Sequence, residues 1–338
     1  MALLNRIFNL IFIILVFVVF AGCQDDEVFM CKVDSHFQMP DSIIKKDSQY
    51  IVLIGDIQEY TSTDDLATYL YKTCDWLRSV QYYYNNLICV LQNGDLTWDN
   101  GWPSWKRADH AVEHLGENIV YIPSIGNHDY KWGGKDNVQI LDRGSTRLNS
   151  NPNICRLKKE KIDFFEEGKL DNIIVPLGGK MNSWNIISLE FGPRAEVIDW
   201  ADSIVSCNAE NRYILMTHEW LTRDGVRINE GSYAEKHFEG QSYSTPQEIW
   251  EKMVYPNNNI ICVVCGHNGF CKYLFTSNEK GREVCQILFN LQYQKNGGDG
   301  MIQLWEFQED MKKIKISVYN TITRKVYADE STQIEIPI

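Results

Sequence analysis

The most informative stretch of this sequence reads Val120-Tyr-Ile-Pro-Ser-Ile-Gly126-Asn127-His128-Asp129. It begins as a short apolar run, typical of a strand buried on both faces, and it ends in side chains that can bind metals or carry protons. Four more stretches share this design, with an apolar run followed closely by a carboxylate, an amide or an imidazole. They are Ile51-Val-Leu-Ile-Gly-Asp56-Ile-Gln58, Leu87-Ile-Cys-Val-Leu-Gln-Asn93-Gly-Asp95, Tyr213-Ile-Leu-Met-Thr217-His218-Glu219 and Ile260-Ile-Cys-Val-Val-Cys-Gly266-His267-Asn268-Gly269.

These strand ends predict one shared site. In open α/β sheets, ligands bind beyond the carboxyl ends of the strands, so we expect the polar side chains to gather at one edge. Oxygen and imidazole ligands together suit two hard or borderline divalent metal ions. The side chains expected there are those of Asp56, Asp95, Asn127, His218 and His267.

The order of the motifs resembles that of the calcineurin-like metallophosphoesterases, over roughly residues 50–269. The pattern of that family is Asp-x-His, Gly-Asp, Gly-Asn-His-Asp/Glu, a lone His and Gly-His-x-His, and Gly126–Asp129 is its most specific part here. The resemblance implies an α/β fold with two packed mixed β-sheets flanked by helices, a four-layer α/β/β/α sandwich. It also implies hydrolysis of phosphomonoesters or phosphodiesters by a metal-activated water at a dinuclear site.

Two positions depart from the family pattern. Gln58 stands where the family has a metal-binding His, and Gly269 stands where the second His of Gly-His-x-His should be. The first metal site therefore keeps Asp56, the shared Asp95 and the amide oxygen of Gln58, which resembles an Asp-x-Gln branch with an oxygen-rich first site. The resemblance leaves the second site complete, with Asp95 as the bridge together with Asn127, His218 and His267.

Two divalent ions are the implied cofactors, drawn from Mn, Fe, Mg and Zn. An oxygen-rich first site favours Mn or Mg over Zn. A later stretch, from Asn290 to Gly300, resembles a segment of related secreted esterases, and Asn290 or Gln292 is a candidate for the missing ligand.

The resemblance gives His128 and Asp129 catalytic roles. His128 is similar to the residue that contacts the phosphate and protonates the leaving oxygen, and Asp129 is expected to orient it.

The tryptophans that follow the Asp95 motif either stack on a sugar or base of the substrate or hold their loop to the core. They are Trp98, Trp102 and Trp105.

Two other readings compete with this one. His110-Ala-Val-Glu113-His114 matches the inverted zinc-peptidase pattern, but it lies on a predicted helix between two phosphoesterase motifs. The rival for the whole chain is a surface-displayed binding protein with a degenerate, one-metal phosphoesterase site, since Gln58 and Gly269 both weaken the same metal position.

The first residues read as a processing signal followed by a tether. Residues 1–22 carry a short apolar run that ends in small residues, as a signal peptide does, and residues 23–44 form the tether. Ala21-Gly22-Cys23 resembles the bacterial lipobox, which predicts an exported lipoprotein anchored through Cys23 to the outer membrane or cell surface. An ordinary cleaved signal with an incidental Cys is the alternative. Residues 45–338 are predicted to form a single domain, with the core motifs in 50–269 and further strands in 270–338.

Charge and cysteine content bear on partners. The formal net charge of −12 argues against nucleic acid as the main partner. It also repels a small phosphoester substrate at long range, and bound metal ions would reverse this effect locally. The sequence leaves the oligomeric state open.

Cysteines are scattered, and an exported setting permits disulfides. Cys271 and Cys285 flank a predicted turn and are the best candidate pair.

Strand–helix alternation followed by a run of strands suits two packed mixed sheets with helices outside. We expect a long irregular excursion over residues 129–172. Strands are expected over residues 45–55, 87–92, 119–125, 173–176, 183–190 and 213–217, and helices over 62–85, 104–118 and 196–207. An antiparallel series is expected over residues 273–275, 283–289, 301–307, 314–320 and 325–327.

Overall fold

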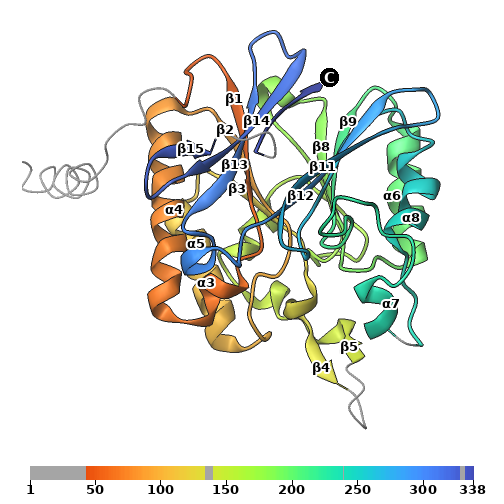
Figure 1. Cartoon of the computed structure of the whole chain (residues 1–338), viewed down its shortest axis with the longest axis horizontal. Coiled ribbons are helices and arrows are strands. Elements are labelled where there is room, and N and C mark those ends of the chain that lie inside the picture. Colours follow the sequence, from red (N-terminus) through yellow and green to blue (C-terminus); the bar gives the residue numbers. More distant parts are fainter. Residues whose placement is uncertain (1–42, 134–139, 239, 328–331) are drawn as a thin grey trace, which may run out of the picture. The chain divides into compact units, whose positions relative to one another are not determined.

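Two mixed β-sheets pack face to face in the structure, and helices cover the outer face of each sheet (Figure 1). The structure is a computed structural model that describes residues 43–133, 140–238, 240–327 and 332–338. Residues 44–338 belong to one compact unit. The expected α/β class, with two mixed sheets flanked by helices, is confirmed.

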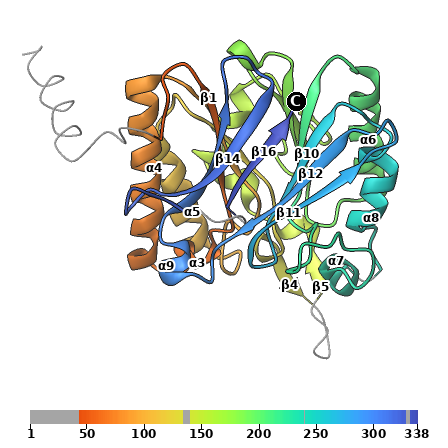
Figure 2. The same cartoon turned by 45° about the horizontal axis from the view of Figure 1, so that its top comes forward.

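The first sheet is seven-stranded, in the order β15-β14-β13-β1-β2-β3, and β16 also pairs with β14 (Figure 2). Its central strands run parallel, whereas β13 runs antiparallel to β1. The register places Val52 beside Val90 on one side and Leu304 on the other, so that these apolar side chains are fully buried. The strands are β1 (Gln49–Ile54), β2 (Leu87–Gln92), β3 (Val120–Pro123), β13 (Met301–Phe307), β14 (Lys313–Asn320), β15 (Lys325–Tyr327) and β16 (Gln333–Pro337).

The second sheet is also seven-stranded, in the order β11-β12-β10-β9-β8-β7-β6. Strands β8, β9, β10 and β12 are parallel to one another, and the outer strands are antiparallel. The strands are β6 (Asp163–Phe164), β7 (Ile173–Pro176), β8 (Trp184–Ser188), β9 (Arg212–Met216), β10 (Ile260–Cys265), β11 (Phe270–Ser277) and β12 (Glu283–Asn290).

Side chains from both sheets meet in the interior. The rings of Trp184 on β8 and Phe307 on β13 pack edge to face with centroids 5.2 Å apart. Gln303 on β13 donates to the hydroxyl of Tyr273 on β11 over 3.1 Å. These contacts hold the two sheets in a defined relation, so the carboxyl ends of the strands of both sheets meet at one edge.

Helix α4 (Asp64–Tyr84) shows why the outer layers form. It buries one stripe of side chains with helical spacing, including Leu70, Leu77 and Val80. The hydroxyl of Thr63 accepts a hydrogen bond from Leu66 N at its start. The other helices are α3 (Gln58–Ser62), α5 (Trp102–Leu115), α6 (Ala195–Cys207), α7 (Tyr233–His237), α8 (Pro246–Ile249), which continues into the π-helix η6 (Trp250–Val254), and α9 (Lys295–Gly298).

The described residues of the stretch 129–172 are largely irregular, as expected, apart from three short strands and several single turns. A two-stranded sheet of β4 (Lys131–Gly133) and β5 (Ile140–Asp142) extends from the edge that carries the strand ends (Figure 1). The 3₁₀ turns in the part of the chain that the structure describes are η1 (Asn127–Asp129), η2 (Arg143–Ser145), η3 (Leu148–Ser150), η4 (Ile154–Lys159) and η5 (Gly179–Met181).

The C-terminal strands differ from the expected antiparallel series. Strand β12 forms a hairpin with β11 but pairs with β10 in parallel, and the chain then crosses to the first sheet at β13. The register also corrects the proposed pairing of Cys271 with Cys285. Cys271 lies opposite Phe289 and Cys285 lies opposite Phe275, so the two thiols do not face each other.

The expected signal peptide, most of the tether and Cys23 lie outside the described residues. Within the described part of the chain, no helix has the length and apolar character needed to cross a bilayer.

Candidate metal centre

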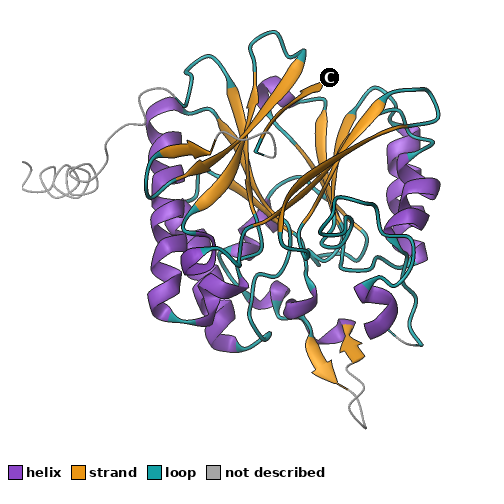
Figure 3. Cartoon of the chain, in the orientation of Figure 1, coloured by secondary structure: helices purple, strands orange, loops and turns teal. Residues whose placement is uncertain are grey.

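Loops from both sheets converge at the carboxyl ends of the parallel strands (Figure 3). Asp56 follows β1, Asp95 follows β2, and Asn127 follows β3. His218 follows β9 and His267 follows β10. The structure therefore brings together side chains that are up to 211 residues apart in sequence, as in the contact of His267 N with Asp56.

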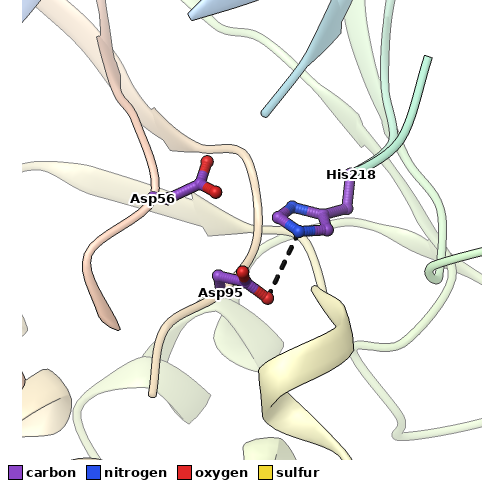
Figure 4. A group of neighbouring side chains, drawn as sticks. All are labelled: Asp56, Asp95 and His218. Atoms are coloured by element: carbon purple, nitrogen blue, oxygen red, sulfur yellow. Dashed lines mark ion pairs between the residues drawn. The ribbon is translucent and has the colours of Figure 1, made fainter. Parts of the chain in front are cut away.

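The two carboxylates and one imidazole form the centre of this group (Figure 4). Asp56, Asp95 and His218 each offer a ligand atom, and these atoms lie within 4.8 Å of one another. All three side chains are buried. The Oδ1 atom of Asp95 lies 3.2 Å from Nε2 of His218. Its other oxygen, Oδ2, accepts a hydrogen bond from Gln58, so the two oxygens of this carboxylate can serve two neighbouring ions.

Asn127 joins the two histidines. Its Oδ1 atom lies 3.2 Å from Nε2 of His218 and 2.9 Å from Nδ1 of His267. The other ring nitrogen of His218, Nδ1, lies 2.9 Å from the carbonyl oxygen of Asn93. A carbonyl can only accept, so Nδ1 carries a hydrogen and Nε2 is the ring nitrogen that a metal ion would bind. A backbone carbonyl commonly fixes a metal-binding histidine in this way.

Gln58 lies at the start of α3, directly after the loop that carries Asp56. Its amide nitrogen donates to Oδ2 of Asp95 over 2.8 Å. Its amide oxygen, Oε1, is buried and has no hydrogen-bond partner among the described residues. A buried polar atom without a partner costs about 1–3 kcal/mol, and it therefore indicates a ligand that the protein alone does not supply.

Asn290 holds the other carboxylate. Its side-chain nitrogen donates to Oδ2 of Asp56 over 2.7 Å, and its Oδ1 accepts from the backbone N–H of Gln292 over 3.0 Å. The amide oxygen of Asn290 thus already accepts a hydrogen bond. Asn290 positions Asp56 by donating a hydrogen bond to its carboxylate. Neither the sequence pattern nor the strand spacing indicated this contact, because Asn290 becomes a neighbour only through the parallel pairing of β12 with β10.

Tyr293 covers the position of the second departure from the family pattern. A Cβ atom added to Gly269 would lie 2.7 Å from Cδ2 of Tyr293. Any side chain at residue 269 therefore requires the Tyr293 ring to move. This ring is 72% exposed at the edge of the centre, and no sequence motif marks it as part of the site.

His128 and Asp129 lie beside the centre but do not contact each other as expected. The Nδ1 atom of His128 lies 2.6 Å from the carbonyl oxygen of Trp98, which orients the ring. The carboxylate of Asp129 instead accepts from the backbone of Gly126, Leu96 and Thr97 over 2.9–3.0 Å. The expectation that the Asp129 side chain orients His128 is therefore wrong, because that carboxylate is used to join two loops.

The motif glycines are needed where the loops touch. A Cβ atom on Gly126 would lie 2.1 Å from Oδ1 of Asp95, and one on Gly266 would lie 2.0 Å from Oδ1 of Asp56. One on Gly94 would lie 2.4 Å from Nδ1 of His218. Each glycine thus makes room for a candidate ligand that comes from a different motif.

The backbone is held in an uncommon conformation at two candidate ligands. The φ angles of Asp95 and His267 are 52° and 65°. Residues other than glycine rarely adopt positive φ, and such residues cluster at functional sites. The surrounding contacts, including the bond from His128 N to Asp95 Oδ1 over 2.9 Å, hold these turns in place.

Burial makes the charges of the centre interdependent. It raises the pKa of Asp56 well above its usual value, and the nearby Asp95 raises it further while His218 lowers it. Burial also disfavours the charged form of Asp95, but the positive charges at His218 and His128 outweigh it and hold the pKa of Asp95 well below its usual range. Burial opposes protonation of His218 too, but the two carboxylates raise its pKa to about 10.

The pKa values of His267 and Asp129 are shifted by the same burial and neighbouring charges. Burial and the positive charge at His218 lower the pKa of His267 to about 3, so this ring is neutral and can act as a ligand. Burial, with the charge of Asp95, raises the pKa of Asp129 to about 7 against the hydrogen bonds that it accepts. These buried acidic groups lie close enough to compete for one proton or cation. A bound divalent ion would neutralise their charge.

The three tryptophans after the Asp95 motif differ in whether they pack in the core or are exposed near the centre. Trp105 is fully buried and donates to Oδ1 of Asn100 over 2.8 Å, so it belongs to the core. Trp98 is 45% exposed, and its ring centroid lies 5.8 Å from that of His128. Trp102 is exposed, with the guanidinium of Arg147 over its ring. Trp98 is therefore the tryptophan placed to meet a ligand of the centre.

The geometry of the loops agrees with comparison to known proteins. A model of the calcineurin-like phosphoesterase family matches residues 50–269, and the chain belongs to this family.

Three similar proteins are of particular interest. "Uncharacterized protein YvnB" of Bacillus subtilis (strain 168) is 23% identical over 345 residues, which cover 91% of this chain and 24% of that protein. The chain thus spans about a quarter of this curated relative. The structure of purple acid phosphatase PPD1 from yellow lupin (Lupinus luteus) seeds shares the fold, with a TM-score of 0.51, 14% identity and coverage of 86% of this chain and 54% of that one. The 5'-nucleotidase precursor from Thermus thermophilus has a TM-score of 0.42 and 12% identity, over 86% of this chain and 55% of that one.

Proposed function

We propose that this chain hydrolyses phosphomonoesters or phosphodiesters at a two-metal centre. The observation that carries the proposal is the Oε1 atom of Gln58, which is buried and has no partner among the described residues. The amide of Gln58 contacts one oxygen of the Asp95 carboxylate, and the other oxygen of that carboxylate faces His218. One ion would be held by Asp56, Asp95 and Gln58. The other would be held by Asp95, Asn127, His218 and His267.

The donor atoms fit divalent ions. Asp56, Asp95, Gln58 and Asn127 offer oxygen, and His218 and His267 offer ring nitrogen. Oxygen ligands favour Mn or Mg, whereas imidazole also suits Zn and Fe, so we propose Mn or Mg at the Gln58 side. When bound, two such ions would neutralise the phosphoryl oxygens and lower the pKa of an attacking water.

The protein supplies the rest of the chemistry. The carbonyl of Trp98 holds Nδ1 of His128, so Nε2 is the ring position left to exchange a proton with the departing oxygen. Asp129 keeps the His128 loop against the Asp95 loop through its backbone contacts. Asn290 and the backbone N–H of His267 restrain Asp56, the latter over 3.1 Å, so that the carboxylate is placed before substrate binds.

The exposed rims of Trp98 and Tyr293 are proposed to contact the group that the phosphate is attached to. Both rings stand at the edge of the centre, and aromatic faces bury a large area with a defined orientation. The proposed setting is export to a bacterial outer membrane or cell surface through a lipid on Cys23, for which the support is the sequence Ala21-Gly22-Cys23 after an apolar run.

The test uses purified full-length protein that has been treated with chelator and then supplied with Mn. Hydrolysis of p-nitrophenyl phosphate and bis(p-nitrophenyl) phosphate is followed, and metal content is measured in parallel. We expect hydrolysis of at least one ester that returns with added Mn, with two ions per chain at saturation. Saturation at one ion with no hydrolysis of either ester would overturn the proposal and favour a binding protein with a one-metal site.

A further inference from the structure

A second metal-binding group lies away from this centre, on helices α4 and α5. His110 and His114 stand one turn apart on α5, and their Nε2 atoms are 3.3 Å from each other. The Nδ1 atom of His110 lies 2.8 Å from Oε2 of Glu113, and the Nδ1 atom of His114 lies 2.8 Å from Oδ1 of Asp75 on α4. The matched histidine motif of the sequence thus meets a carboxylate from another helix.

The hydrogen-bond partners determine where the protons are. A carboxylate can only accept, so each Nδ1 must carry a hydrogen. A neutral imidazole with a hydrogen on Nδ1 has a bare lone pair on Nε2. Two bare lone pairs then face each other across 3.3 Å, which is unfavourable unless a proton or a metal ion lies between them. Metal-binding histidines characteristically donate their other ring N–H to a carboxylate in this way.

We propose that His110 and His114 form a surface site for a zinc ion. Zinc binds imidazole nitrogens at about 2.0–2.1 Å in a tetrahedral arrangement, and two such nitrogens lie about 3.3–3.4 Å apart. The observed Nε2–Nε2 separation of 3.3 Å matches this edge. A square-planar ion at the same bond length would bring neighbouring nitrogens to about 2.8–3.0 Å. The two remaining positions of the zinc ion are open to water.

Contacts with Tyr71 fix the orientation of the His110 and His114 rings. Tyr71 on α4 stacks on His114 with centroids 4.8 Å apart and planes at 1°, and it meets His110 edge to face at 4.9 Å. The carboxylates of Asp75 and Glu113 add two negative charges beside the two rings. Of the two cations on this helix near the histidines, Arg107 is paired with Asp64, its Nε atom lying 2.6 Å from Oδ1, and Lys106 is exposed.

The site is independent of the proposed hydrolysis. Its side chains are partly exposed on helices of the outer layer, whereas the metal centre is buried at the strand ends (Figure 1). Replacing both histidines should therefore leave the fold and the hydrolytic activity in place. The sequence pattern suggested a peptidase, but the structure places Glu113 as a partner of the His110 ring nitrogen.

The test titrates chelator-treated full-length protein with zinc chloride in a calorimeter. The double variant His110→Ala, His114→Ala should bind one zinc ion fewer per chain than the wild type and keep wild-type hydrolysis of p-nitrophenyl phosphate. The control Lys106→Ala, an exposed change on the same helix, should keep the wild-type zinc count. Equal zinc counts in the wild type and the double variant would overturn the site, whatever the catalytic centre binds.

A second measurement reads the tautomers directly. Nitrogen-15 spectra of the histidine rings in metal-free protein should show the hydrogen on Nδ1 of both His110 and His114. Asp75→Asn should lower the zinc affinity by about 10-fold or more, as loss of such carboxylates does in other sites. Rings with the hydrogen on Nε2, or an affinity unchanged by Asp75→Asn, would overturn the argument from lone pairs.

Discussion

The side-chain amide of Gln58 donates to Oδ2 of Asp95 over 2.8 Å, which leaves its own Oε1 atom buried without a partner among the described residues. A histidine is the family's residue at this position, and the amide replaces a nitrogen ligand with an oxygen. We expect the ion on this side to be held more loosely than the ion on the histidine side. Dialysed protein should retain about one metal per chain and regain activity as Mn is added.

Removing that oxygen should weaken the site further. Gln58→Ala should raise the Mn concentration needed for half-maximal activity by about 10-fold or more, since ligand and neighbouring groups contribute on this scale. The measurement is activity against free Mn, with Gln49→Ala at the start of β1 as the control amide. An unchanged Mn dependence in Gln58→Ala would contradict a role for its oxygen as a ligand.

Asp95→Asn should abolish nearly all hydrolysis. The change removes a negative charge that both ions need, and loss of one preorganised group at a reacting centre costs factors of about 10²–10³. Steady-state rates with Mn present, together with metal content, provide the measurement. Asp65→Asn makes the same chemical change in the exposed first turn of α4 and should behave like the wild type. Turnover near wild type in Asp95→Asn would refute the assignment.

His128→Ala should affect poor leaving groups most. A general acid contributes about 10²–10⁴-fold where the departing oxygen is basic, and much less where it is a nitrophenolate. Rates on alkyl and nitrophenyl phosphates in the same variant supply the comparison and its internal control. If both substrates lose activity equally, His128 positions the phosphate and does not protonate the leaving group.

Gly126→Ala should disturb both fold and centre. Its Cβ would lie 2.1 Å from Oδ1 and 2.2 Å from N of Asp95, so the two loops must separate. We expect the free energy of unfolding to fall by about 1–3 kcal/mol, as for overpacked interiors, with loss of activity. Gly178→Ala is the matched control, because its Cβ would meet nothing within 4 Å. Urea unfolding curves that coincide for Gly126→Ala and Gly178→Ala would contradict the close approach.

Cys23→Ala should release the protein from membranes if the lipobox is used. The motive is Ala21-Gly22-Cys23 at the end of the apolar run. Fractionation of cells that express each form measures this, with Cys207→Ala, an exposed thiol on α6, as the control. A variant that remains in the membrane pellet and is extracted only by detergent would argue against a lipid anchor.

Local patterns in the sequence were sufficient for much of the fold. The strand at Leu87–Gln92 was predicted with the bounds that the structure shows, because a short apolar run between a helix and a Gly-Asp turn has few alternatives. The expected grouping of Asp56, Asp95 and His218 is also present, since parallel strands direct their carboxyl ends to one edge.

The second half of the chain was less predictable. Strands β11 and β12 form the expected hairpin, but the parallel pairing of β12 with β10 and the passage to β13 in the other sheet depend on contacts between distant segments. The pairing of Cys271 and Cys285 failed for a related reason. Register in a hairpin is set by its turn, and here the turn places Cys285 opposite Phe275.

The sequence by itself determined which side chains end the strands, because the apolar runs and the polar residues after them are local features. Only the tertiary structure decided what each of those side chains touches. Asp129 joins two loops, Asn290 restrains Asp56, and Tyr293 fills the space above Gly269. Likewise Asp75 reaches His114 from another helix. These partners are set by how the two sheets and their loops pack, and packing between segments far apart in the chain leaves no periodic pattern in the sequence.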